Sequence, residues 1–169
     1  MNDTFPAGHK PQNLAGYLEA LSRPVFQAGI SWRVVDAKWD AIRNGFAGFA
    51  PEVVAAYDLA DIERLLNDPS VIRSKAKILA VIDNARTVLE LDAGYGGFGK
   101  YLQSHDGFED TVADLKRRFR FIGDSGAYHF LWLVGEPTPP HGEWPVPRQR
   151  AARGAPSATG ARRRAGSGS

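Results

Sequence analysis

Apolar residues recur at helical spacing along nearly all of residues 12–134, and no segment alternates apolar and polar residues as a half-buried strand does. The longest such pattern covers 74–91. Shorter patterns predict helices at 12–22, 32–44, from Pro51 onward, around 59–66, at 98–105, at 109–119 and from an N-cap at Ser125 to Val134, with Pro24 beginning a separate segment. The sequence therefore predicts an all-α fold.

The chain divides into a helical body, residues 1–147, and a tail, residues 148–169. The tail holds six arginines and no acid among alanine, glycine, serine and proline, a composition typical of disorder. It is either a solubilising terminus or a weak arm for phosphates. The whole chain has 21 basic and 19 acidic residues, which leaves 15 and 19, a net charge of −4, in the body. Any reason to expect nucleic-acid binding by the body must therefore come from local clusters.

Several classes of protein are excluded by what the sequence lacks. No run of 18 apolar residues exists, so we expect no membrane span. Residues 1–10 lack the basic-then-apolar pattern of a signal peptide, which favours a cytoplasmic protein. The chain has no cysteine, which removes disulfides, thiolate catalysis and Cys-ligated zinc. We expect a monomer that needs neither cofactor nor metal.

Two basic helix junctions are the local clusters that could bind DNA. The first is the turn 68–77, and the second is the segment 115–135, in which a basic helix end meets the short apolar hairpin 121–123 and a second helix. Backbone N–H groups at such a hairpin and at a helix N-terminus can hold a phosphate, and nearby cations add Coulomb attraction. The predicted DNA contacts are Arg73, Lys75, Lys77, Arg117, Arg118, Arg120, Gly123 and Ser125. The alternative is an ordinary helical hairpin whose basic end complements the dipole of the first helix.

Specific motifs resemble a known family. They are QAGISW (27–32), the following helix VVDAKWDAIRNGF, GFAPEVVA (48–55), IERLLNDPSVIRSKAKILAVIDNA (62–85) and FRFIGDSGAYHFLWLVG (119–135). In this order they resemble the DNA-3-methyladenine glycosylase I family of helix-hairpin-helix DNA glycosylases, over roughly residues 24–135. The resemblance implies an all-α glycosylase-like domain with its hairpin at about 115–135, and double-stranded DNA containing alkylated bases as the partner.

The sequence also departs from that family's pattern. The family carries a pocket glutamate eight residues before the tryptophan of its QAG-x-SW motif, and here that position is Pro24. The family's upstream His-Asp-x-Glu-Trp-Gly run has no counterpart. The Cys and His zinc clasp of the family cannot form in its usual way, and Arg118 stands where the family usually has glycine. The resemblance therefore carries over the scaffold but not the usual base-recognition set.

Base release needs an aromatic pocket and a group that stabilises positive charge on the sugar. The resemblance places Trp32 in the base pocket, and we add Gln27 from the same motif and Trp39. Asp36, one turn after Trp32, is the candidate catalytic carboxylate, and Glu19 is a weaker one. The alternatives are that both tryptophans are core residues and that Asp36 is a surface or ion-paired acid.

The sequence thus predicts a monofunctional DNA repair glycosylase that hydrolyses the N-glycosidic bond of an alkylated purine, 3-methyladenine-like, in base excision repair. One alternative is a catalytically inactive DNA- or lesion-binding helix-hairpin-helix protein, and another is a helical protein that acts through protein contacts. If the glycosylase prediction holds, a hollow walled by indole should lie beside the hairpin near Ile122.

Overall fold

The computed structural model describes residues 8–140, and every regular element within this range is helical. Residues 8–137 belong to one compact unit. The helices are α1 (Leu14–Gln27), α2 (Trp32–Ala37), α3 (Trp39–Gly45), the 3-10 turn η2 (Ala47–Phe49), α4 (Pro51–Val54), α5 (Leu59–Leu66), α6 (Lys75–Tyr95), α7 (Phe98–Leu102), α8 (Phe108–Arg118) and α9 (Asp124–Leu133). The tail 148–169 lies outside the described residues.

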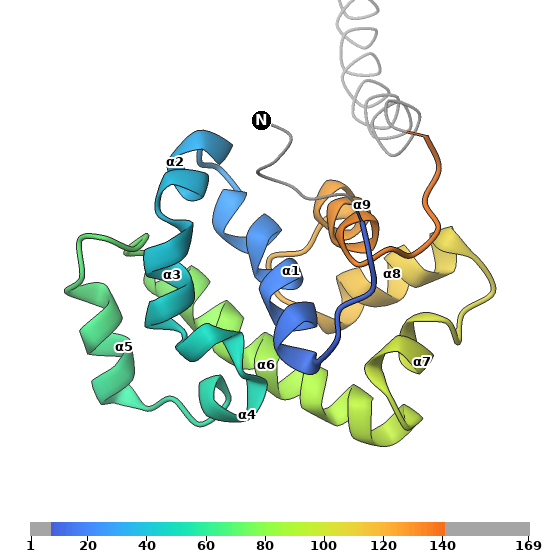
Figure 1. Ribbon diagram of the computed structural model, residues 1–169, viewed down its shortest axis with the longest axis horizontal. Helices are drawn as coiled ribbons and strands as arrows, with labels where there is room; N and C mark the ends of the chain where they lie inside the picture. Colours follow the sequence, from blue (N-terminus) through green and yellow to red (C-terminus); the bar gives the residue numbers. More distant parts are fainter. Residues whose placement is uncertain (1–7, 141–169) are drawn as a thin grey trace, which may run out of the picture. The chain divides into compact units, whose positions relative to one another are not determined.

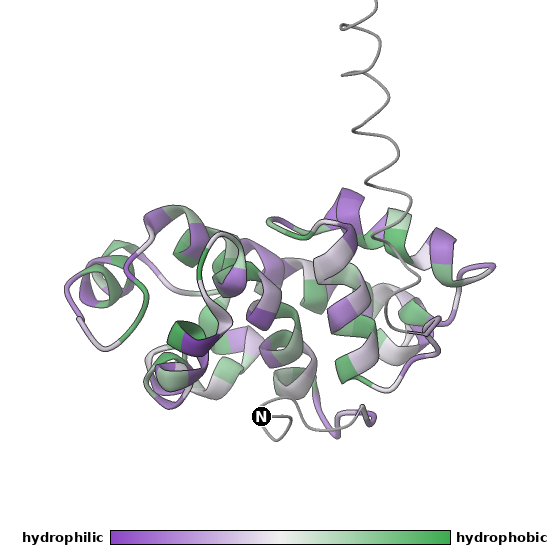
Figure 2. Cartoon of the chain, turned by 90° about the horizontal axis from the view of Figure 1, so that it is seen from above, coloured by the Kyte–Doolittle hydropathy of each residue, from purple (hydrophilic) through white to green (hydrophobic). Residues whose placement is uncertain are grey.

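Helix α6 is the centre of this unit. It begins at its N-cap Ser74, whose side chain accepts from Lys77 N, and ends at Gly96, which adopts a left-handed conformation (φ 74°). Figure 1 shows α6 running past α1, with α2 to α5 on one side and α7 to α9 on the other. Helix α6 contacts α1, α4, α5 and α7. The hydropathy colouring in Figure 2 shows hydrophobic and hydrophilic residues intermixed along the helices, as the helical periodicity predicts.

Two helix boundaries differ from the prediction near the N-terminus. Helix α1 continues through Pro24 to Gln27, although a proline inside a helix removes one hydrogen bond. Packing of its apolar side offsets this loss, because Leu18, Leu21 and Val25 are all fully buried. The predicted helix 32–44 is two helices, since the backbone at Lys38 leaves helical geometry (φ −100°, ψ 2°).

The last helix begins differently from the prediction as well. Gly123, not Ser125, is the N-cap of α9, and Ser125 lies in its first turn. No side chain caps this N-terminus.

None of the helices in residues 8–140 is both long enough and apolar enough to cross a membrane.

Candidate functional site

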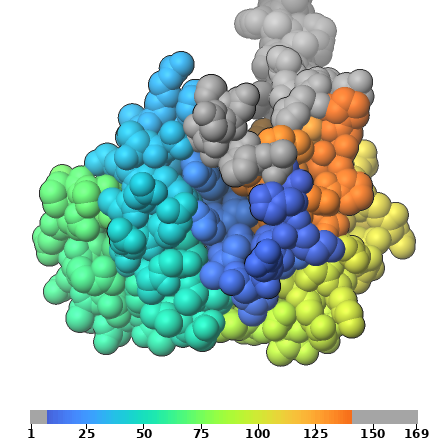
Figure 3. Space-filling model, in the orientation of Figure 1, coloured from blue at the N-terminus to red at the C-terminus, as the bar shows by residue number. Residues whose placement is uncertain are grey.

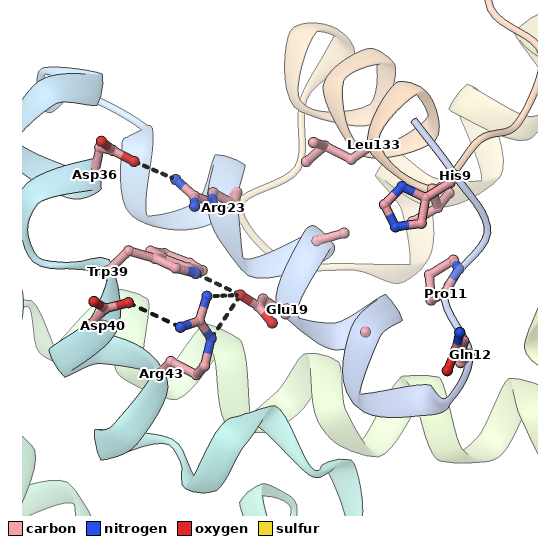
Figure 4. Close-up of a pocket in the computed structure, with 13 residues that line it drawn as sticks. His9, Pro11, Gln12, Glu19, Arg23, Asp36, Trp39, Asp40, Arg43 and Leu133 are labelled. Atoms are coloured by element: carbon pink, nitrogen blue, oxygen red, sulfur yellow. Dashed lines mark hydrogen bonds and ion pairs between the residues drawn. The ribbon is translucent and has the colours of Figure 1, made fainter. Parts of the chain in front are cut away.

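Facing polar side chains join α1 to α2 and α3. The residues Glu19, Arg23 and Gln27 are four apart, so they lie on one side of α1. Arg23 Nη1 lies 3.5 Å from Asp36 Oδ1 on α2. Further along, Glu19 accepts from Trp39 on α3. We call this set the polar groove; it consists of Glu19, Arg23, Gln27, Asp36, Trp39 and Arg43, and Figure 4 shows most of it.

A cavity of about 560 Å³ opens over the polar groove. One wall is formed by Asp36, Trp39, Asp40 and Arg43. The floor is α1, and the other wall is formed by residues 9–12 together with the end of α9. Figure 3 shows the corresponding depression between the surface of α2 and α3 and the surface of α1. Two predicted acids, Asp36 and Glu19, thus line the same hollow.

Trp39 is a wall of this cavity rather than a stacking platform, contrary to its predicted place in the base pocket. Its ring stacks on Phe49 at a centroid distance of 5.6 Å, and the Arg23 guanidinium lies 4.3 Å from the ring centroid. Only 2% of the residue is exposed. Because the residue is almost fully buried, its ring is not accessible to a nucleobase.

Glu19 is held in place by three donors. Its Oε2 accepts from Trp39 Nε1 at 2.8 Å and from Arg43 Nη2 and Nε at 2.8 and 3.1 Å. The bond to Glu19 is the main cause that raises the pKa of Arg43. Glu19 precedes position 24 by five residues, which at about 100° per residue places it about 140° away around the helix. Glu19 therefore points to a different side of α1 from Pro24.

Trp32 is not among the side chains that line the cavity. It begins α2 and is 41% exposed, with the Arg33 guanidinium 5.0 Å from its ring centroid. Asp36 follows Trp32 by four residues and therefore lies on the same side of α2. The indole of Trp32, unlike that of Trp39, presents accessible surface.

Gln27 ends α1, just before the turn that leads to Trp32. Its Nε2 is buried and has no hydrogen-bond partner among the described residues. A buried donor without an acceptor destabilises a fold by about 1–3 kcal/mol, so such a group calls for an explanation. A bound molecule that offers a hydrogen-bond acceptor to Gln27 Nε2 would explain it.

Lys77 holds this turn from inside the protein. Its Nζ donates to Phe26 O at 3.1 Å and to Ala28 O. The residue is only 7% exposed, and burial lowers its pKa. Lys77 is one of the predicted DNA contacts, and this prediction is wrong, because its buried ammonium already binds two carbonyls and cannot reach a phosphate. Arg73 and Lys75 are exposed, as a DNA contact requires.

Pro24 is buried against the first turn of α9. A Cβ atom added to Gly126 would lie 3.1 Å from the Cβ of Pro24 and 3.9 Å from Ile122 Cδ1. The position eight residues before Trp32 thus packs beside the hairpin, and a glycine at 126 allows the close approach.

The hairpin itself comprises residues 119–123, between α8 and α9. Asn84 of α6 binds its main chain twice, since Arg120 N donates to Asn84 Oδ1 at 2.9 Å and Asn84 Nδ2 donates to Arg120 O at 3.2 Å. Phe121 follows with a φ of +61° and is 46% exposed. The hairpin is therefore fixed in shape from the central helix.

The cations beside the hairpin are paired with acids. The nearly buried Asp114 binds Arg117, and also Arg118 through Nε at 2.9 Å. Lys116 Nζ lies 2.8 Å from Asp124, and Arg120 Nε lies 3.0 Å from Asp83. These pairs tether the cations, although the side chains of Arg117 and Arg120 stay largely exposed.

The cavity reaches from the side of α1 beside the hairpin to the far end of α9, and an indole-walled hollow at the hairpin stays a prediction. The cavity is lined by Leu133 and Val134 at the end of α9, whereas the hairpin precedes its start. Ten helical residues separate this end of the cavity from the hairpin by roughly 15 Å. Pro24 lies beside the hairpin. Arg23, the residue before it in the chain, pairs with Asp36.

Sequence reasoning missed several residues of this region. Arg23 and Arg43 complete the polar groove, and Asn84 and Asp114 organise the hairpin. Asn84 carried a usable signal, because it is a polar residue within the buried stripe of α6. The partners of the two arginines lie on other helices, which the linear sequence does not indicate.

Comparisons with known proteins bear on this arrangement. The family model described as methyladenine glycosylase matches residues 8–120. DNA-3-methyladenine glycosylase 1 of Escherichia coli is 31% identical over 130 residues, covering 64% of this chain and 70% of that protein. A crystal structure of 3-methyladenine DNA glycosylase I superposes with a TM-score of 0.67 at 27% identity, covering 76% and 82% of the two chains. A variant of such an enzyme in complex with 3-methyladenine gives 0.68 at 26%, covering 79% and 84%.

Proposed function

This chain belongs to the methyladenine glycosylase family, and we propose that it acts on DNA as a 3-methyladenine glycosylase in base excision repair. The match to 8–120 and the likeness to solved glycosylases confirm the family, the all-α fold and the enzyme class expected from the sequence motifs. The reaction is hydrolysis: the bond between the base and C1′ of deoxyribose breaks and the base leaves with the bonding electrons. Water bonds to C1′ and loses one proton to the solvent, which leaves a hydroxyl group there.

We propose that the protein is a divergent member that uses neither a glutamate at position 24 nor a zinc clasp. Position 24 is a proline buried against Gly126. The chain has no cysteine for a clasp. The described residues contain no cluster of three or more His, Asp or Glu side chains that could hold a metal.

The base is proposed to bind where α1 ends and α2 begins. Trp32 offers accessible indole surface there, and Gln27 offers a buried N–H donor without an acceptor in the described structure. A purine stacked on Trp32 could accept from Gln27 at a ring nitrogen. The observation that carries this placement is that Asp36 lies on the same side of α2 as Trp32 and pairs with Arg23. Arg23 is next in the chain to Pro24, which packs against Gly126 beside the hairpin.

Asp36 is proposed to stabilise the charge that develops during cleavage. As the bond to the base lengthens, positive charge spreads over the sugar ring, and a fixed carboxylate lowers the energy of that state. Arg23 holds the Asp36 carboxylate toward α1. An N3-alkylated adenine carries a positive charge and is already a good leaving group, so no strong general acid is required. Glu19, which three donors hold, is assigned to the structure of the groove instead.

Duplex DNA is proposed to bind to a monomer, with the hairpin, Arg73 and Lys75 contacting phosphates. Main-chain N–H groups at the uncapped start of α9 point outward from the helix and favour an anion. Such contacts hold the duplex without reading its sequence, as a repair enzyme that must scan all DNA requires.

A second function, lesion binding without cleavage, is favoured by the proline at position 24. The test is base release from duplex DNA treated with a methylating agent, followed by chromatography of the released bases, together with binding measurements at several salt concentrations. The proposed enzyme releases 3-methyladenine at a rate that depends on protein concentration. Salt-dependent binding without release would establish the second function, and neither binding nor release would contradict both.

A further inference from the structure

Phe121 is unusual because it is an apolar residue that is exposed to solvent. It is a large aromatic residue that is 46% exposed, at the tip of the hairpin, while its neighbours Phe119 and Ile122 are buried. Its φ of +61° lies in the left-handed region, which L-residues with large side chains rarely adopt. Conformations of this kind persist where the surrounding structure imposes them, and they gather at functional sites.

The surrounding structure that imposes this conformation is Asn84. Its side chain is 1% exposed and pairs with both the N–H and the C=O of Arg120, the residue just before Phe121. Asp83, the neighbour of Asn84 on α6, binds the Arg120 side chain at 3.0 Å. Main chain and side chain of Arg120 are therefore both anchored to α6, and the next residue is directed outward.

The charges around the tip identify the partner. Arg117 and Arg120, whose side chains are largely exposed, both precede Phe121 in the sequence, and the N-terminus of α9 follows it. An apolar ring between cations and outward N–H groups complements a polymer in which flat apolar bases alternate with phosphates. Apolar side chains that insert between base steps are a common means of bending duplex DNA.

We propose that Phe121 is a DNA-contact residue whose ring lies against a base or sugar of the duplex, and that Asn84 is the residue that positions it. This rests on the proposed function as a DNA glycosylase. The phosphate on either side of the contacted nucleotide is held by the hairpin main chain and its cations, so the ring and the charges act on the same short stretch of one strand.

The test compares Phe121→Ala, Phe121→Tyr and, as a matched control, Val53→Ala, which truncates an apolar residue of similar exposure (45%) on α4. Fluorescence anisotropy measures binding to a duplex that contains an abasic-site analogue. Phe121→Ala should weaken binding by about 5- to 150-fold, the range expected when one aromatic ring that stacks on a base is removed. Phe121→Tyr and Val53→Ala should bind as the unmodified protein does.

A 2-aminopurine placed beside the abasic analogue reports directly on insertion. Its fluorescence should change when the unmodified protein binds, and it should change much less with Phe121→Ala at saturating concentration. Unchanged affinity and unchanged fluorescence for Phe121→Ala, with base release by the unmodified protein intact, would overturn this inference alone. Absence of both binding and base release by the unmodified protein would overturn the proposed function as well.

The role of Asn84 is tested by a double-mutant cycle. Asn84→Ala should weaken DNA binding in the unmodified background but have little further effect when Phe121 is already alanine, because the two act as one unit. Asn84→Asp keeps the acceptor for Arg120 N and serves if Asn84→Ala does not fold, as judged by circular dichroism. Equal losses in both backgrounds would show that Asn84 does not act through Phe121.

Discussion

Trp39 donates its indole N–H to the Glu19 carboxylate across 2.8 Å, and this bond ties α3 to α1 beneath the cavity. The same oxygen of Glu19 accepts twice from Arg43. One carboxylate thus satisfies an almost fully buried indole and orients a guanidinium, which makes Glu19 a structural centre of the groove.

Replacing Glu19 with alanine is therefore expected to destabilise the protein. The Trp39 N–H loses its acceptor in a site where little water can replace it, and the free energy of unfolding should fall by about 2 kcal/mol. Urea denaturation followed by tryptophan fluorescence measures the change. Asp40→Ala is the control, because the exposed Asp40–Arg43 pair contributes only about 0–1 kcal/mol. Equal stability of Glu19→Ala and the unmodified protein would contradict this role.

Base release should depend on Trp32 and Asp36 but not on the indole of Trp39. Asp36→Asn should slow single-turnover release of 3-methyladenine by roughly 100-fold, since it removes one fixed charge from the site. Trp32→Ala should also impair release, while both variants keep their affinity for undamaged duplex. Trp39→Phe serves as the comparison, because Trp39 is almost fully buried. Full activity of Asp36→Asn and Trp32→Ala would remove this site assignment.

The exposed Arg73 and Lys75 should contribute to DNA binding, whereas the buried Lys77 should contribute to stability. The double substitution of Arg73 and Lys75 by alanine should weaken duplex binding and lower the slope of log affinity against log salt by about 2, or about 0.9 for each phosphate that the variant no longer neutralises. Lys77→Met should leave that slope unchanged but lower the stability, because the carbonyls of Phe26 and Ala28 lose their donor. A reduced salt slope for Lys77→Met would show that Lys77 reaches DNA after all.

Tyr101 makes the stability sensitive to alkaline pH. Its hydroxyl donates to Asp114 Oδ2 at 2.7 Å, and burial raises its pKa from 10.0 to about 12. Between these two pH values the folded protein holds a proton that the unfolded chain has released. The contribution of Tyr101 to the free energy of unfolding is therefore complete below pH 10 and is lost as the pH rises to about 12.

Tyr101→Phe removes both the hydrogen bond and its titration. The variant should be less stable than the unmodified protein by about 1 kcal/mol near neutral pH. The difference in unfolding free energy between the two proteins should shrink as the pH rises from 10 toward 12. Urea denaturation across this range measures it, and a difference that stays constant with pH would contradict the raised pKa.

Much of the fold followed from local patterns. The 3.6-residue periodicity located α6 and α8, and Pro51 correctly marked the start of α4. The failures occurred where long-range packing overrode a local rule. Pro24 lies inside α1 because the buried side of that helix compensates for the lost hydrogen bond. The break of the predicted helix 32–44 at Lys38 has no local sequence signal.

The sequence by itself determined the all-α class, the family motifs and the absence of a cysteine site, because these depend only on residue types and their spacing. It also identified Asp36, Glu19 and Trp32 as notable residues. Only the tertiary structure decided the partners of the two carboxylates, because these partners come from other helices. Glu19 is held by Trp39 and Arg43 of α3, whereas Asp36 pairs with Arg23 of α1.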